Sequence, residues 1–266
     1  STLARSLTLA LALAAGAALV LALPPYSILP FALIAFAVLA IMLHGTPWPV
    51  AFRIGYLFGL GQFVPGLFWI TESFQVEADR FGWLALPAVF GLAALLAVFP
   101  AFACALAARM ARAGLPLSLS LATGWTGLEW LRGHVLTGFP WNLAAYTLAD
   151  WLPLAQMASL VGSYGLGFLL VLCSALVGLA FRAPARRLQV IRFASATAIA
   201  VTVAGFGVAR LALSVPPSER GAHIRVVQPN IAQSAKWDEG SRKANILRLL
   251  SLSARPGDYD ILLWPE

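Results

Sequence analysis

Charged residues are few in this chain. Only 11% of its 266 residues are charged, whereas 60% are hydrophobic. Soluble domains are roughly a quarter charged and about half apolar. So few charged side chains do not cover a globular surface, and the composition therefore excludes an ordinary soluble protein and favours a membrane protein.

Cysteine and histidine are also scarce. Cys104 and Cys173 both lie inside apolar runs, where a thiol stays protonated and unreactive. Their spacing indicates neither a disulfide framework nor a zinc site. The three histidines are far apart and lack the spacing of metal ligands: His44, His134 and His223. The sequence predicts neither a metal site nor a cofactor.

The net charge is +7, but the basic residues are spread over short connections between apolar runs. A nucleic-acid-binding protein gathers such residues on one face, so we expect no nucleic-acid partner.

A bilayer core needs about 20 apolar residues in a helix. Seven runs approach that length, and we predict a transmembrane domain over residues 1–213 with spans near 7–23, 28–43, 54–71, 84–106, 115–131, 157–181 and 191–213. A cleaved signal peptide is the alternative for the first run, although Pro24 and Pro25 lead directly into another apolar run.

The arginines predict the orientation. With the N-terminus inside, the inner segments hold eight arginines and the outer connections hold two, Arg80 and Arg132. This bias follows the positive-inside rule. Seven spans then place the segment after residue 213 on the outer side, which in a bacterium is the periplasm.

Two polar features lie near the expected outer face. Glu129 and Arg132 are three residues apart, so on a helix they share a face and are expected to neutralise each other. The connection over residues 133–156 is long and almost uncharged. Its apolar character fits either an entrance for a lipid or an interfacial helix without chemistry.

The pattern changes after residue 213. Residues 223–228 and 259–264 are expected to be strands, and residues 240–254 have the apolar spacing of a helix. Such a strand–helix–strand unit pairs its strands in parallel. Ligands collect at the carboxyl ends of such strands, and Glu266 lies at one of these ends. Glu266 is therefore a candidate site residue, with a solvated carboxylate as the alternative.

Three stretches resemble bacterial apolipoprotein N-acyltransferases, which are membrane-anchored members of the carbon–nitrogen hydrolase (nitrilase) superfamily. The stretches are EWLRG at 129–133 with TGFPWN at 137–142, ASLVG at 158–162 with YG at 164–165, and VQPNI at 227–231 with KWD at 236–238 and LWPE at 263–266. The resemblance implies a polytopic α-helical membrane protein of about seven transmembrane helices. Residues 214–266 would begin a truncated periplasmic α/β nitrilase-like (αββα) domain.

The resemblance also implies chemistry. Glu266 matches the general base of the family, whereas the lysine and the cysteine nucleophile are expected beyond residue 266, so this stretch alone would be inactive. Trp237 is expected to line the substrate route, with plain packing as the alternative. The implied partners are a membrane phospholipid as acyl donor, a diacylglyceryl-apolipoprotein as acceptor, and the lipid bilayer of the inner membrane. Two other functions stay open: a membrane-tethered amidase or nitrilase, and a non-enzymatic transporter or scaffold.

Overall fold

The computed structural model describes residues 2–75, 77–214, 221–236 and 239–265, without the side chains of residues 2–5, 233 and 234. The chain divides into two compact units. The helical unit comprises Ser1–Phe68 and Val89–Leu213, and the second unit comprises Trp69–Ala88 and Ser214–Glu266. Each unit is described by itself.

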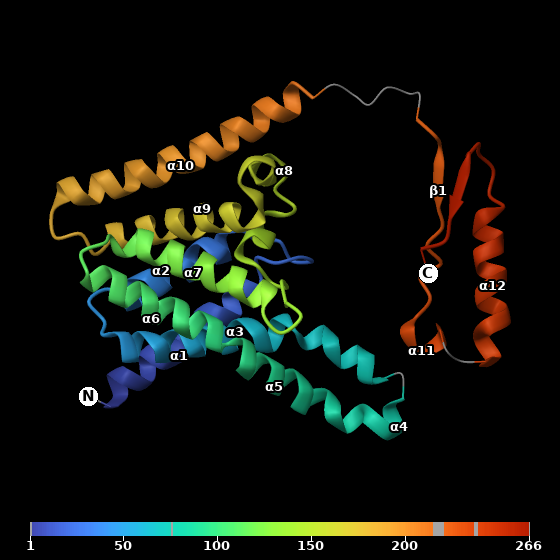
Figure 1. Cartoon of the computed structure of the whole chain (residues 1–266), viewed down its shortest axis with the longest axis horizontal. Coiled ribbons are helices and arrows are strands. Elements are labelled where there is room, and N and C mark those ends of the chain that lie inside the picture. The colour runs from blue at the N-terminus through green and yellow to red at the C-terminus, as the bar shows by residue number, and fades with distance from the viewer. Residues whose placement is uncertain (1, 76, 215–220, 237–238, 266) are drawn as a thin grey trace. The chain divides into compact units, whose positions relative to one another are not determined.

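The helical unit consists of apolar helices joined by short connections (Figure 1). Proline starts several of these helices, where its missing N–H costs no hydrogen bond, as Pro30 does for α2. Glycines with positive φ, Gly45 and Gly114, turn the chain between helices. The helices are α1 (Thr2–Val20), α2 (Pro30–Leu43), α3 (Trp48–Gly66), α5 (Ala85–Leu96), α6 (Val98–Arg112), α7 (Leu117–His134), η3 (Ala144–Leu148), α8 (Leu152–Ala155), α9 (Ala158–Ala180) and α10 (Arg186–Ala212).

Several helices are suited to a membrane by length and composition. Three qualify outright: Ala78–Arg112, Ala158–Ala180 and Arg186–Ala212. The bent pair Trp48–Gly66 and Phe68–Gln75 makes a fourth if it forms one span. Helices α1 and α2 are apolar but shorter. The chain is thus a largely helical protein of membrane type, and the count of seven spans stays a prediction.

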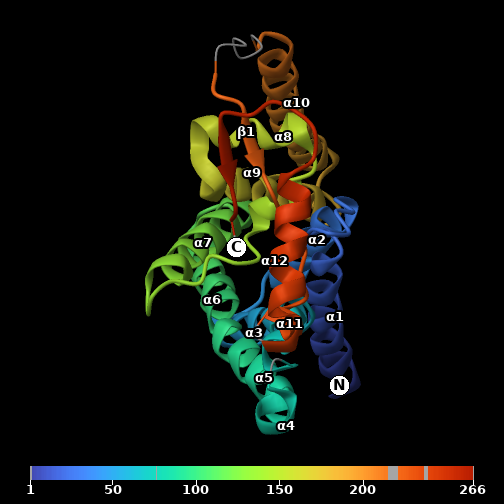
Figure 2. The same cartoon turned by 90° about the vertical axis from the view of Figure 1, so that its right-hand side faces the viewer.

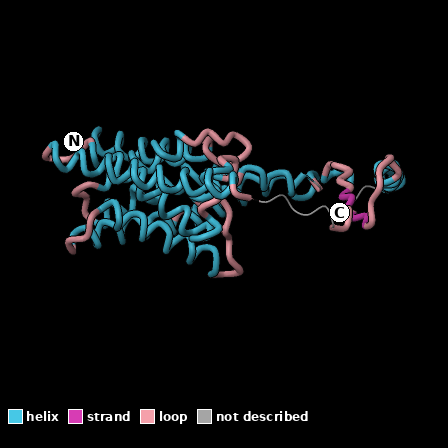
Figure 3. The backbone as a smooth tube through the Cα atoms, turned by 90° about the horizontal axis from the view of Figure 1, so that it is seen from above, coloured by secondary structure: helices cyan, strands magenta, loops and turns pink. Residues whose placement is uncertain are grey.

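The helices run side by side along the unit, and loops gather at its two ends (Figure 3). Helix α3 packs between α1 and α6, while α9 packs against α2, α7 and α10. An aromatic cluster lies where they meet, because the Trp125 ring stands edge-on to Phe36 and Phe58 at centroid distances of 4.9 and 5.6 Å. Close approach of α1 and α3 requires a missing side chain, since a Cβ added at Gly61 would overlap the carbonyl oxygen of Leu13.

The second unit contains a small parallel sheet (Figure 2). Strand β1 pairs with β2, and Ile224 lies opposite Ile261. The parallel pairing and the helix between the strands confirm the predicted strand–helix–strand unit. The described elements are η1 (Phe68–Gln75), α4 (Ala78–Phe81), η2 (Gly82–Leu84), β1 (Ile224–Val226), α11 (Gln233–Lys236), α12 (Glu239–Ser253) and β2 (Ile261–Leu263).

The structure also departs from the expected elements. Each strand has three residues, shorter than predicted, and the short helix α11 was not expected. The connection over residues 133–156 contains η3 and α8 rather than one interfacial helix. The nitrilase-like identity of the second unit and the domain boundary at residue 213 remain predictions.

Candidate functional site

The last turns of α7 bury two charged side chains. Glu129 is 5% exposed and Arg132 is 2% exposed. Burying a charge costs free energy unless the charge is paired and hydrogen-bonded. Their partners therefore identify what this end of α7 is built to hold.

Glu129 binds the backbone rather than the neighbouring arginine. The amide of Ala144 donates a 2.9 Å hydrogen bond to Glu129 Oε1. The two charges act on each other, as expected from their spacing, but the one direct ion pair among the described residues is Arg80–Glu77. Glu129 and Arg132 therefore neutralise each other across a short gap rather than through a salt bridge. The reason is geometric, because each side chain is drawn to a different part of the loop that follows α7.

Arg132 holds that loop from inside. Its Nη1 donates to the carbonyl oxygens of Phe139 at 2.9 Å and Trp141 at 2.6 Å. The guanidinium also lies over the ring of Phe63, 5.1 Å from its centroid. Hydrogen bonds from a charged donor are stronger than neutral ones, so Arg132 fixes the path of residues 139–141 against α3 and α7.

Two amide side chains complete the attachment to α3. Gln62 Nε2 donates a 3.0 Å hydrogen bond to the carbonyl of Asn142. In return, Asn142 Nδ2 donates a 3.1 Å hydrogen bond to the carbonyl of Gly66. The loop is thus tied to two helices by three side chains, and we call residues 135–143 the anchored loop.

The anchored loop has a strained backbone. Leu136, Thr137 and Asn142 have φ angles of 55°, 84° and 54°. Bulky or β-branched residues rarely adopt positive φ, and such conformations persist only where the surroundings impose them. The hydrogen bonds of Arg132 and Gln62 supply that constraint. Strained backbone of this kind concentrates at functional sites.

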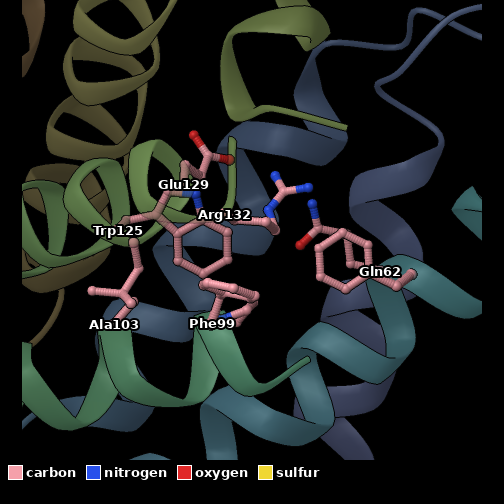
Figure 4. Close-up of a pocket in the computed structure, with 9 residues that line it drawn as sticks. Gln62, Phe99, Ala103, Trp125, Glu129 and Arg132 are labelled. Carbon is pink, nitrogen blue, oxygen red and sulfur yellow. The ribbon is translucent and has the colours of Figure 1, made fainter. Parts of the chain in front are cut away.

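A small cavity lies between α3, α6 and α7, beside the Arg132 side chain (Figure 4). It has a volume of about 10 Å³, roughly the space of one water molecule. Gln62, Trp125, Glu129 and Arg132 line it together with apolar side chains of α3 and α6. A lipid does not fit there, and the polar side chains of the lining are the ones that hold the loop.

The outer face of this region is apolar and aromatic. Leu136 is 82% exposed, and Trp130, Trp141 and Tyr146 are exposed as well. Exposed tryptophan and tyrosine prefer the headgroup layer of a bilayer. A rigid loop that presents such side chains can contact lipid at the membrane surface, as the composition of residues 133–156 suggested.

The predicted residues Glu266 and Trp237 lie outside the described residues. The structure does describe how the strand before Glu266 is held. Arg225 of β1 donates hydrogen bonds to the carbonyls of Ser253, Pro256 and Gly257 at 3.0–3.1 Å. Trp264 Nε1 donates to Ser253 Oγ at 2.9 Å. These contacts connect the end of α12 to both strands.

Other candidate chemistry is limited. Within the described part of the chain, no three His, Cys, Asp or Glu side chains gather closely enough to hold a metal ion. Both cysteines are free, and Cys104 is fully buried. Glu72, in η1, is exposed.

Sequence reasoning missed Gln62 and Asn142. Their roles depend on a chain reversal that brings residue 142 back to α3, 80 positions away. One signal was available, because a glutamine inside an apolar run of α3 needs a partner when it is buried. That signal does not indicate which loop provides the partner.

The chain matches a known family over most of its helical part. The sequence model described as "Apolipoprotein N-acyltransferase N-terminal domain" matches residues 15–176. That range includes the end of α7, the anchored loop and most of α9.

Individual relatives match over nearly the whole chain. Proteins named apolipoprotein N-acyltransferase from Bradyrhizobium diazoefficiens and Caulobacter vibrioides are each 41% identical, over 96% and 97% of this chain. One from Rhodopseudomonas palustris is 38% identical over 96% of it. The matches cover 50%, 49% and 51% of those relatives, so the chain spans about half the length of the curated relatives it matches.

Proposed function

The chain belongs to the apolipoprotein N-acyltransferase family, and from this premise we propose that the whole protein acylates lipoproteins at the outer face of the bacterial inner membrane. The acyl donor is a membrane phospholipid, and the acceptor is the free α-amine of an apolipoprotein's N-terminal diacylglyceryl cysteine. The observation that carries the proposal is the anchored loop, which lies within the matched region and combines buried charged anchors with exposed aromatic side chains.

The helical unit has a physical task in this scheme. Both substrates are lipid-anchored, so their reacting groups stay close to the headgroup layer. Holding two reactants in one place removes much of the entropic cost of their encounter. We assign the anchored loop to this task, with Trp141 and Leu136 against the lipid and Arg132 keeping the backbone rigid.

The chemistry is assigned to the second unit and its continuation. Glu266 accepts the proton of a cysteine thiol expected further along the whole protein, and the thiolate attacks the phospholipid's ester carbonyl. A thioester forms as the ester C–O bond breaks, and lysophospholipid leaves with the proton. The acceptor amine then attacks the thioester, an amide forms, and the thiol is restored. A lysine beyond residue 266 stabilises the oxyanion, and Trp237 lines the route.

The residues of the second unit suit this arrangement. Two parallel strands place their carboxyl ends on one edge, where such sheets bind ligands. Strand β2 ends at Leu263, three residues before Glu266. Residues 214–266 are accordingly proposed to begin a carbon–nitrogen hydrolase-like domain on the periplasmic side.

A mobility-shift assay with a diacylated lipopeptide and phospholipid tests the proposal. We expect the whole protein to convert the lipopeptide to a triacylated product. Glu266→Gln should lower the rate by about 10²–10⁴-fold, the usual worth of a general base. Glu239→Gln, which removes a carboxylate from the start of α12, is the matched control and should retain activity. Equal product from the wild type and Glu266→Gln would remove Glu266 from the mechanism.

A further inference from the structure

A cavity lined by arginine lies at one end of the helical unit. It is formed where α2, α6 and α9 end and where α7 and α10 begin, and its volume is about 310 Å³. Arg112 and Arg192 line it together with His44 and Thr46. In Figure 1 the connections that form it lie together at the left end of the unit.

A second cavity adjoins the first and shares His44 and Thr46 with it. Its volume is about 680 Å³, and Arg53 and Arg182 are among its lining residues. Volumes of roughly 300–1,000 Å³ are typical of ligand sites. We call the two cavities together the arginine end.

No carboxylate balances these charges. Neither cavity has an aspartate or glutamate in its lining. The connections that build the arginine end, residues 44–53, 109–117 and 182–192, contain no acidic residue in the sequence. Arg112 and Arg192 thus line the first cavity and Arg53 and Arg182 line the second, without an acidic partner from these connections.

The helix ends add to the positive field. Helices α3, α7 and α10 begin at this end, and none has a side-chain cap or an acidic residue in its first turn. The N-terminus of a helix carries free N–H groups and a partial positive charge, which favours an anion. The arginines and the helix starts thus point to the same class of ligand.

The lining is not only polar. Leu43, Leu117 and Leu179 form part of the wall of the first cavity, and Ile41, Ile54 and Val50 form part of the second. A free phosphate gains nothing from contact with apolar side chains. A lipid, in contrast, carries its phosphate next to its first methylene groups, so it can contact the arginines and the apolar wall together. Basic pockets between the ends of membrane helices suit acidic lipid headgroups.

We propose that the arginine end binds the headgroup of an anionic phospholipid, with the phosphate between Arg112 and Arg192 and the start of the acyl chains against the leucines. The inference does not depend on the acyltransferase activity. It also does not depend on the orientation of the chain, because it needs only that this end lies in a headgroup layer. A positive-inside signal alone requires arginines in the loops but no cavity between them.

The two arginines differ in a way that helps a test. Arg192 Nη1 donates a 2.6 Å hydrogen bond to the carbonyl of Leu179, so its loss also affects packing. Arg112 is exposed, and its side chain makes none of the hydrogen bonds and ion pairs found in the described part of the chain. Arg187 lies in the same group of connections, lines neither cavity, and serves as the control.

The experiment uses the full chain in detergent, with lipid retention measured by native mass spectrometry and stability measured by thermal unfolding. The probes are phosphatidylglycerol, phosphatidylcholine with the same acyl chains, and inorganic phosphate. We expect phosphatidylglycerol alone to be retained and to raise the unfolding midpoint. Arg112→Gln should weaken retention about tenfold, the worth of one charge-assisted hydrogen bond, while Arg187→Gln should leave it unchanged.

Three results would overturn the proposal. Equal retention of both lipids would show that the headgroup charge is not recognised. Equal stabilisation by inorganic phosphate would indicate a free anion rather than a lipid. An equal loss in Arg112→Gln and Arg187→Gln would reduce the effect to net charge. The test does not depend on a variant of Arg192, whose hydrogen bond to the Leu179 carbonyl also contributes to packing.

Discussion

The two ends of helix α7 lie in regions whose charged side chains have different partners. Its first residue, Leu117, lines a cavity with Arg112 and Arg192, whereas its last turns bury Glu129 and Arg132. The two regions are about 20 Å apart along the helix, at 1.5 Å per residue. Buried charges at the second region are hydrogen-bonded to backbone groups of the anchored loop and of η3, whereas at the arginine end the Arg112 side chain has no such partner among the described residues and Arg192 has one backbone carbonyl.

The difference shows two roles for the few charged residues of this chain. Where an acid and a base are buried together, neighbouring backbone groups must move into place to satisfy them, and a loop becomes rigid. Where only arginines gather, one backbone carbonyl accepts from Arg192 but no acidic side chain of the described residues lines the cavities, and an external anion is the natural partner. The first arrangement builds structure and the second recruits a ligand.

The largest expected effect comes from breaking the buried region. Arg132→Met removes the donor to Phe139 and Trp141 and leaves Glu129 buried without its counter-charge. We expect a loss of about 3–5 kcal/mol in the free energy of unfolding, measured by denaturant titration in detergent. Adding Glu129→Gln to Arg132→Met should recover part of the loss, because neighbouring groups are not additive. A loss below about 1 kcal/mol, similar to that of Arg187→Met, would contradict the anchoring role.

A smaller effect is expected from the close packing of α10 against α8. A Cβ added at Gly207 of α10 would overlap the carbonyl oxygen of Pro153 in α8, whereas one added at Gly205 meets nothing within 4 Å. Gly207→Ala should therefore cost about 1–3 kcal/mol through overpacking, and Gly205→Ala should be close to neutral. Thermal unfolding of the two variants side by side measures the difference. Equal midpoints would show that α8 and α10 shift apart at little cost, and would contradict the expected overpacking.

The smallest effect is expected from adding an acidic side chain to the arginine end, so that both regions contain an acid and a base. Ala111 lines the first cavity beside Arg112, so Ala111→Glu places a carboxylate among the arginines. An exposed ion pair contributes roughly 0.2–1 kcal/mol, and we expect a gain of that size without lipid. The preference for phosphatidylglycerol should fall at the same time. A variant that keeps the full preference would show that the lipid binds elsewhere.

Much of the architecture follows from local sequence. Long apolar runs predicted helices at the positions of α1, α2, α3, α7, α9 and α10, and alternating β-branched residues predicted the paired strands. Local rules also identified Glu129 and Arg132 as unusual. They did not predict that Arg132 contacts carbonyls at 139 and 141, because those atoms reach it only after the backbone turns through positive φ at Leu136 and Thr137.

The arginine end also depends on contacts between distant residues that local sequence does not predict. The sequence assigned its arginines to orientation, which requires only a count in each connection. That Arg112 and Arg192 line one cavity depends on α6 and α10 ending and beginning beside each other, 80 residues apart along the chain. The spacing of residues along the sequence does not predict that these two helix ends lie at the same cavity.

The proposed function needs the segment after residue 213 on the periplasmic side, and the arginine count predicts that the connection at Gly114 lies on the cytoplasmic side. Paired topology reporters test this most directly, using a phosphatase that works only in the periplasm and a fluorescent protein that fluoresces only in the cytoplasm. Fusion after Gly114, at the arginine end, should give fluorescence, and fusion after Leu213 should give phosphatase activity. Fluorescence after Leu213 would contradict the proposed function, because Glu266 would then lie across the membrane from the lipoprotein's amine. Phosphatase activity after Gly114 would contradict the predicted orientation of the arginine end.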